Sequence, residues 1–286
     1  MAQYLNNNGE IVNKHYNEMR PDEKLNTIAR SKVFSMGSAI NKVKANGDKP
    51  FYEKPMSAKE IVDTMPFNAL TGKPFTKAEE VHLRLECQAN GYKDLRFVTE
   101  NEAKLIDPNA RLKEYVDERT GESRKVDGIV TDKLQTEAYR RNEKGEIVKY
   151  QQDVKNKKGE IIHAKGDNML EKLHEPKVYK IPLYHVSQFE NLKLSKDLPK
   201  LNKEAVMEQQ KDYINSNRQI SYKAIDRIEK QGMNSGICNQ MKQFMDCRAK
   251  GINFGGKEQY QQQDKQQEQE KTQAKAPKKK ETAREM

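Results

Sequence analysis

The stretch PFNALTGKPF, residues 66–75, places two prolines, a glycine and two phenylalanines around one asparagine and one lysine. Gly72 permits a backbone with positive φ, and Pro74 stiffens the chain that leaves the turn. The stretch therefore predicts a rigid loop that presents Lys73. The Asn68 side chain has two alternative roles at this position: it either caps the turn or contacts a ligand.

Helix signals surround this loop. Residues 20–47 predict a long helix that begins at Pro21 and stops at Gly47. RFV at 96–98 is a short extended segment. Three further helices should begin at capping boxes, in which a Ser or Thr side chain and a Glu three residues later satisfy each other's backbone N–H groups. These boxes are Ser57 with Glu60, Thr76 with Glu79, and Thr99 with Glu102.

The pattern changes between residues 124 and 186. NEKGEIVKY (142–150) and NKKGEIIHA (156–164) are near-duplicates, and each is typical of a turn that enters a strand. KVYKIPLYHV (177–186) predicts a strand in which Pro182 indicates an edge or a bulge. The middle of the chain should therefore be an antiparallel sheet with hairpins.

Helical patterns return after residue 192, at about 202–216, 221–231 and 235–249. On the last of these, an apolar stripe is expected to pack against another element. The stripe consists of Ile237, Met241, Phe244 and Met245. Residues 257–286 are rich in Gln and Lys and nearly free of apolar groups, so we expect them to be disordered.

The expected fold class is α+β, with N-terminal helices packed on a mostly antiparallel sheet, then a helical C-terminal extension and a disordered tail. Four segments follow from the patterns. They are an N-terminal arm (1–20), a folded domain (21–192), the helical extension (193–256) and the tail (257–286).

Charge favours a polyanionic partner. The 286 residues carry a net charge of +10, while only 34% of them are hydrophobic, so the core should be small for this length. Nucleic acid, an anionic membrane surface, or simply a lysine-rich surface would all account for the charge. Residues 104–158 carry fourteen basic and eleven acidic groups, and no segment is a purely basic tail. Any binding groove must therefore be assembled by folding.

The cysteines and the hydropathy indicate a cytoplasmic protein without a membrane segment. An odd count of three, Cys87, Cys238 and Cys247, with no CxxC, is typical of free thiols in a reducing compartment. The first residues are polar and give no sign of a signal peptide. No apolar run approaches the ~18 residues that a membrane span needs.

Catalytic motifs are missing from the sequence. HEPKV at 174–178 begins like a zinc-binding HExxH, but Val178 replaces the second ligand and Pro176 would break the helix. FGGKE at 254–258 has the wrong spacing for a phosphate loop. Cys87 and His82 are five residues apart and poorly aligned on one helix face, so a buried thiol is expected. We therefore expect no enzyme, no metal and no cofactor.

Two blocks carry a family resemblance. NALTGKPF followed by a helix, and then GYKDLRFVTENEA at 91–103, resembles the N-terminal domain of ArdC antirestriction proteins, which also opens some plasmid primases. YKIPLYHVSQFENL at 179–192 resembles that family's closing strand, so the resemblance covers residues 21–192. The resemblance implies that the protein binds single-stranded DNA. It also implies that the protein is encoded on a mobile element, such as a plasmid, a conjugative element or a phage. Its role would be antirestriction or protection of incoming DNA.

The chain also departs from the family pattern. TKAEE follows the loop where Arg-Gly-Ile-Asn is usual, and Leu95 and Phe97 replace a Pro and a Trp. GESRKVDG at 121–128 is the nearest match to a basic, glycine-rich turn of the family, with the two KGE turns as rivals. Full-length ArdC proteins add a C-terminal metallopeptidase-like domain. Because this sequence has no HExxH, we expect that domain to be absent or replaced here.

Single-strand binding requires cations along a groove and rings that stack on bases. The candidate residues are Asn68, Lys73, Phe75, Tyr92, Lys93, Arg96, Arg124, Lys125, Tyr139, Arg140, Arg141, Tyr150, Tyr179 and Tyr184, with Phe97 as a further ring. Each ring has core packing as its alternative role.

A second hypothesis is an adaptor in which residues 199–250 dock a primase, relaxase or restriction subunit. An exposed Met/Phe stripe on these helices would favour it.

Overall fold

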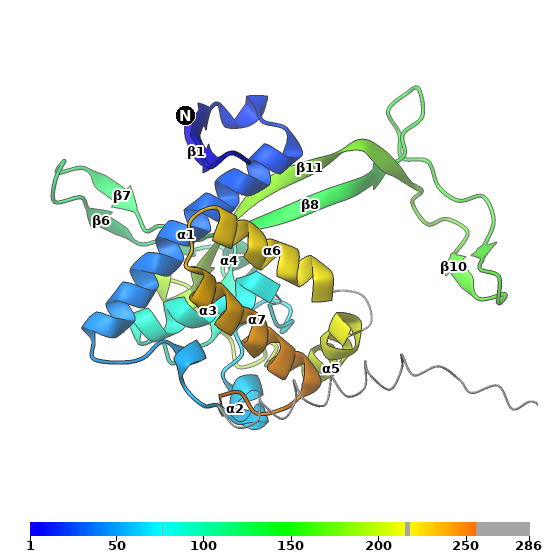
Figure 1. Ribbon diagram of the computed structural model, residues 1–286. Helices are drawn as coiled ribbons and strands as arrows, with labels where there is room; N and C mark the ends of the chain where they lie inside the picture. The colour runs from blue at the N-terminus through cyan, green and yellow to red at the C-terminus, as the bar shows by residue number, and fades with distance from the viewer. Residues whose placement is uncertain (76, 215–217, 256–286) are drawn as a thin grey trace, which may run out of the picture.

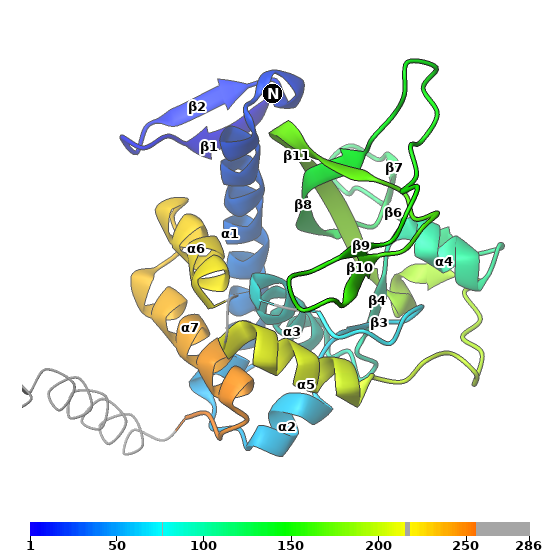
Figure 2. The same cartoon turned by 90° about the vertical axis from the view of Figure 1, so that its right-hand side faces the viewer.

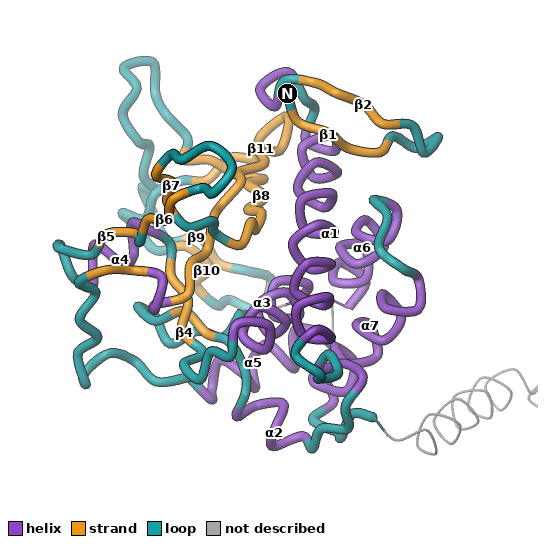
Figure 3. The backbone as a smooth tube through the Cα atoms, turned by 90° about the vertical axis from the view of Figure 1, so that its left-hand side faces the viewer, coloured by secondary structure: helices purple, strands orange, loops and turns teal. Residues whose placement is uncertain are grey.

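The computed structural model describes residues 1–75, 77–214 and 218–255 (Figure 1). The expected cap at Thr76 and the expected disordered tail, 257–286, lie outside these residues. Most strands gather on one side of the molecule and most helices on the other, except that the β1–β2 pair lies beside α1 and α4 lies among the strands (Figure 3). This arrangement confirms the α+β class. No helix in the described ranges is both long and apolar enough to cross a bilayer.

The helices begin and end where local signals place them. They are α1 (Pro21–Ala45), α2 (Ala58–Asp63), α3 (Lys77–Asn90), α4 (Glu100–Ile106), α5 (Lys203–Asp212), α6 (Arg218–Lys230) and α7 (Ser235–Lys250). Both described capping boxes are confirmed, because Ser57 and Thr99 each accept the N–H of the Glu three residues on and each Glu reaches back. Gly251, with φ of 65°, ends α7 in the left-handed conformation that suits glycine.

A four-stranded sheet has the order β3-β4-β11-β8. Its strands are β3 (Phe67–Asn68), β4 (Arg96–Val98), β11 (Leu170–His185) and β8 (Ile129–Tyr139). Only β3 and β4 are parallel. Two-stranded pairs complete the inventory: β1 (Ala2–Leu5) with β2 (Ile11–Lys14), β5 (Arg111–Leu112) with β12 (Phe189–Glu190), β6 (Glu114–Val116) with β7 (Ser123–Lys125), and β9 (Val154–Lys155) with β10 (Ile161–His163).

The two longest strands, β8 and β11, extend beyond the helices and carry residues 140–169 at their far end (Figures 1 and 2). We call residues 133–180 the arm. Ten residue pairs join β8 and β11, from Leu183 opposite Ile129 to Leu170 opposite Tyr139, with one irregularity in β11 between Lys172 and Lys177.

One turn design occurs at three hairpins. In NEKGE, NKKGE and NNNGE, the Asn Oδ1 accepts the N–H of the Glu four residues on, and the Asn Nδ2 donates to that Glu carboxylate. The glycines, Gly145, Gly159 and Gly9, have φ between 80° and 83°. Both predicted turns are confirmed. A strand, β10, follows the second turn as predicted, whereas only isolated bridges at Ile147 and Lys149 follow the first, so the strand predicted there is wrong. The third shapes the β1–β2 hairpin within residues 1–20, the segment expected as an N-terminal arm, and each of its strands has four residues.

The largest hydrophobic cluster joins α1 and α3 to α6 and α7. The predicted stripe on α7 is confirmed, since Met241, Phe244 and Met245 are buried in this cluster and Ile237 packs against it. The helices of the expected extension therefore share one core with the N-terminal helices.

A buried charge cluster lies beside that core. Glu80 accepts from Arg84 Nε at 3.0 Å, and its other oxygen lies 2.8 Å from Arg248 Nε. Arg84 also donates to the Thr64 carbonyl at the end of α2, and Arg248 donates to Gln209 on α5 at 2.7 Å. One carboxylate thus holds two guanidinium groups that would otherwise be buried without a counter-charge.

Candidate nucleic-acid interface

The NALTGKPF loop is held together by its own asparagine. Asn68 Oδ1 accepts the N–H groups of Leu70 and Thr71, each at 3.0 Å, and Nδ2 donates to Glu102 Oε1 at 2.9 Å. The candidate ligand contact at Asn68 is therefore corrected to a turn cap, because its side chain is used inside the fold. Lys73 is exposed and forms no ion pair with the residues that the structure describes.

Four candidate rings lie in the protein interior or against it. Phe97 is fully buried and meets Phe75 edge-on at 6.4 Å between ring centroids. Tyr184 is 9% exposed and packs edge-on against Phe189. Tyr92 stacks on His185, with centroids 3.8 Å apart and planes 5° from parallel. The expectation that these rings stack on bases is corrected, because each already has a protein partner.

Arg96 also has a partner within the protein, the carboxylate of Asp94. Its Nε donates to Asp94 Oδ1 at 2.9 Å and its Nη2 to Oδ2 at 2.6 Å, which makes a bidentate pair. Hydrogen bonding to Asp94 raises the pKa of Arg96. The negative charge of Asp94 also offsets the positive charge of the Arg96 guanidinium. The neighbouring Lys93 is exposed.

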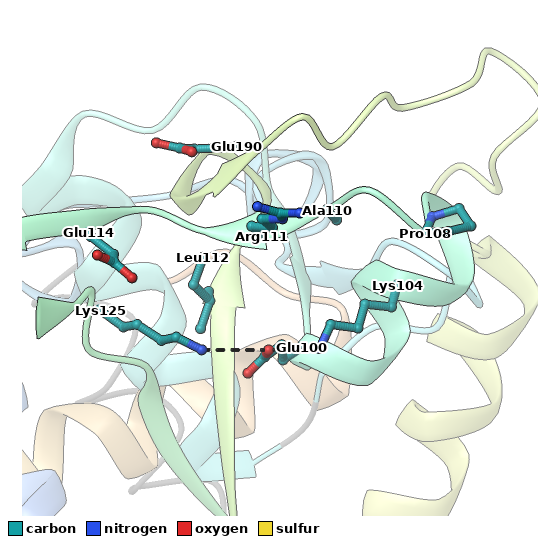
Figure 4. Close-up of a pocket in the computed structure, with 9 residues that line it drawn as sticks. All are labelled: Glu100, Lys104, Pro108, Ala110, Arg111, Leu112, Glu114, Lys125 and Glu190. Carbon is teal, nitrogen blue, oxygen red and sulfur yellow. Dashed lines mark hydrogen bonds and ion pairs between the residues drawn. The ribbon is translucent and has the colours of Figure 1, made fainter.

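The β6–β7 hairpin places two candidate cations among carboxylates. Arg124 pairs with Asp117 at 3.0 Å and Glu122 at 3.2 Å, and Lys125 approaches Glu100 at 4.0 Å. Lys125 also lines a cleft of about 460 Å³ between this hairpin and α4 (Figure 4). Its other lining residues are Glu100, Lys104, Pro108, Ala110, Arg111, Leu112, Glu114 and Glu190. Three cations face three carboxylates, a balance that does not favour a polyanion.

The arm gathers exposed rings and lysines on one face. Tyr139 is 52% exposed and Tyr179 is 44% exposed, and the Tyr179 hydroxyl donates to Gln135 at 2.9 Å. Residues that oppose each other in a strand pair share a face, and so do alternate residues along a strand. The register thus defines the arm face, which consists of Lys133, Gln135, Glu137 and Tyr139 of β8 and Leu170, Lys172, Lys177 and Tyr179 of β11. Glu137 is its single carboxylate.

The opposite face of the arm is turned toward α1. Asp132 accepts from Lys32 of α1 at 2.6 Å. Leu134 and Pro176 line a cleft of about 400 Å³ with the first turns of α1, and Val178 is buried. The arm face therefore points away from α1.

The loops beyond the arm strands hold the last candidates. Arg140 and Arg141 are exposed and directly follow Tyr139, and Arg141 Nη1 donates to the Gly145 carbonyl at 2.5 Å. Tyr150 is half-buried and stacks on His163 with centroids 4.7 Å apart, so one face of its ring is occupied. The two arginines extend the positive charge past the arm face.

Sequence reasoning missed the lysines of the arm face, Lys133, Lys172 and Lys177, and an exposed ring at Tyr115 on β6. The alternation in KVY (177–179) is the only local signal for them. It could not be used without the strand register.

Comparison of the chain with protein-family models, with curated proteins and with solved structures finds no match in any of the three. Within residues 1–75, 77–214 and 218–255, no group of three or more His, Cys, Asp or Glu side chains is placed to hold a metal ion.

Proposed function

We propose that the protein binds single-stranded DNA along the arm face. One observation carries the proposal: two exposed tyrosines and three lysines share this face with a single carboxylate. Stacking of a base on an aromatic ring is worth about 1–3 kcal/mol, and lysines on the same face neutralise phosphates. The rings can be used only by unpaired bases, so a single strand is preferred to duplex.

The sequence resemblance to the ArdC N-terminal domain supports the same ligand. On that basis we extend the proposal to a protein of a mobile element that covers or protects DNA entering the cell as a single strand, with antirestriction as the consequence. No catalytic step is part of this function.

One observation weighs against the adaptor hypothesis. An exposed Met/Phe stripe on the C-terminal helices would favour it, but Met241, Phe244 and Met245 are buried against the N-terminal helices. We therefore favour DNA binding over docking through residues 199–250.

The test is a titration of labelled oligo-dT and of a duplex of equal length at two salt concentrations. The single strand should bind more tightly, and its affinity should fall with salt by about 0.7 in log–log slope for each phosphate that is neutralised. Equal affinity for both ligands, or an affinity that does not depend on salt, would overturn the proposal.

Two lysines on one strand provide a matched pair for locating the site. Lys177 lies on the arm face, and Lys180, three residues along β11 and also exposed, lies on the opposite face across from Asp132. Lys177→Ala should weaken binding and lower the salt slope by about 0.7, whereas Lys180→Ala should leave the slope unchanged. The same loss in both variants would place the DNA elsewhere.

A further inference from the structure

The outer strand of the sheet has no neighbour on one side. β8 is the last strand in the order β3-β4-β11-β8, and its residues Ile129–Tyr139 pair only with β11 among the described strands. An edge strand of this length presents backbone N–H and C=O groups that a further strand can use.

Part of this edge is exposed. α1 contacts β8 near Asp132 through Lys32, and Thr131 is buried. Beyond residue 133 the strand runs out past the helices (Figure 1). Each side chain from residue 133 to residue 139 is exposed or half-buried, although Leu134 also lines the cleft with the first turns of α1. Leu134 is among the exposed apolar side chains.

The exposed segment is complementary to itself. If a second copy of β8 pairs with it antiparallel about a two-fold axis at Gln135, Lys133 of each copy lies opposite Glu137 of the other. Opposite charges in such cross-strand positions stabilise the pairing of the strands, and like charges destabilise it. Shifting the axis to Lys133 or Glu137 would place like charges opposite each other, so charge selects the register at Gln135.

We propose that two copies of the chain associate through residues 133–137 of β8, with Lys133 of each copy paired to Glu137 of the other. The two four-stranded sheets then become one continuous sheet. Because the two-fold axis is perpendicular to that sheet, both arm faces lie on the same side. The association itself requires no nucleic acid.

A charge-exchange experiment on the full chain tests this pairing. Sedimentation equilibrium without DNA, at low salt and over a wide range of protein concentration, should show wild-type mass rising from 33.2 kDa toward twice that value. Lys133→Glu and Glu137→Lys should each weaken the association, since each places like charges opposite. The double variant Lys133→Glu/Glu137→Lys restores two opposite-charge pairs and should recover the wild-type mass.

Two results would overturn the proposal. One is a wild-type protein that stays at the monomer mass at every concentration. The other is a dimer that associates equally tightly in the single and the double charge variants, because the contact would then lie elsewhere. Circular dichroism and thermal melting show whether each variant is folded. Since mass is measured without DNA, failure here is separate from failure of the oligonucleotide titration.

Discussion

Gly72 lies directly under the main chain at Lys200: a Cβ at Gly72 would be 2.5 Å from the Lys200 carbonyl oxygen and 2.9 Å from Pro199 Cβ. The Asn202 N–H donates to the Gly72 carbonyl at 2.9 Å and fastens the two segments together. The glycine of the NALTGKPF loop is thus required for two reasons, its φ of 68° and the close approach of a segment that follows the sheet.

Gly72→Ala should be far more destabilising than Gly91→Ala. Both glycines have positive φ, 68° and 64°, but nothing lies within 4 Å of a Cβ at Gly91. The left-handed backbone costs each alanine about 1–2 kcal/mol, and only Gly72→Ala adds a clash with backbone. Urea unfolding measures the difference, for which we expect at least about 2 kcal/mol. Equal losses would show that segment 199–202 moves aside freely.

Tyr179→Leu should weaken binding of oligo-dT by about 5- to 150-fold, the equivalent of one lost stacking interaction. Tyr115→Leu is the matched control, because Tyr115 is 43% exposed and also lies opposite a cation, Arg124, but on the β6–β7 hairpin. That variant should bind as wild type does. A comparable loss at Tyr115 would move the interface to the β6–β7 hairpin.

Glu80→Gln should destabilise the fold by about 3–5 kcal/mol, because it leaves two buried guanidinium groups without their carboxylate. Glu100→Gln removes an exposed pair with the same helical spacing, Glu100 with Lys104, and should cost less than about 1 kcal/mol. Chemical denaturation of both variants at neutral pH measures the two losses. A small loss for Glu80→Gln would mean that the buried arginines find other partners.

His82 should make the fold sensitive to acid. Its ring is buried, Nε2 lies 2.9 Å from Ser35 Oγ, and burial lowers its pKa to about 3, so its 3.8 Å approach to Glu86 is not an ion pair at neutral pH. Between pH 3 and the unfolded pKa of about 6.5, the unfolded chain binds a proton that the folded chain does not. The free energy of unfolding should therefore fall as the pH drops through this window, by up to about 1.4 kcal/mol per pH unit.

Urea unfolding at several pH values between 6.5 and 4.5 checks this, with the pH range set by the ordinary histidine pKa of about 6.5. His82→Gln should flatten the pH dependence by up to one proton, and His15→Gln, at an exposed histidine, should not change it. If His82→Gln keeps the wild-type slope, the acid sensitivity comes from other groups. Glu23 adds to the acid sensitivity mainly below its ordinary pKa of 4.5, because hydrogen bonding from the Arg20 backbone lowers its pKa in the fold to about 2.

Local signals in the sequence determined much of the fold. The capping boxes at Ser57 and Thr99, the stop of α1 before Gly47 and the Asn-x-x-Gly-Glu turns all act between residues three to five positions apart. Such signals can be read from the chain itself because every group involved is close in sequence. The sequence also predicted the apolar stripe of α7, but it did not predict which helices cover that stripe.

Only the tertiary structure decided which side chains are free to bind. Tyr179 and Tyr184 lie five residues apart in one strand, yet Tyr179 is exposed on the arm and Tyr184 is buried against Phe189. The two rings lie on opposite faces of β11. Tyr184 packs in a hydrophobic cluster with Leu112 and Phe189 at the end of β11 that pairs with β4, while Tyr179 lies where β11 projects past the helices. Burial and strand register depend on contacts between residues that are distant in sequence. The pattern of residues therefore named candidate rings and cations, and the pairing of β8 with β11 determined which of them share a face.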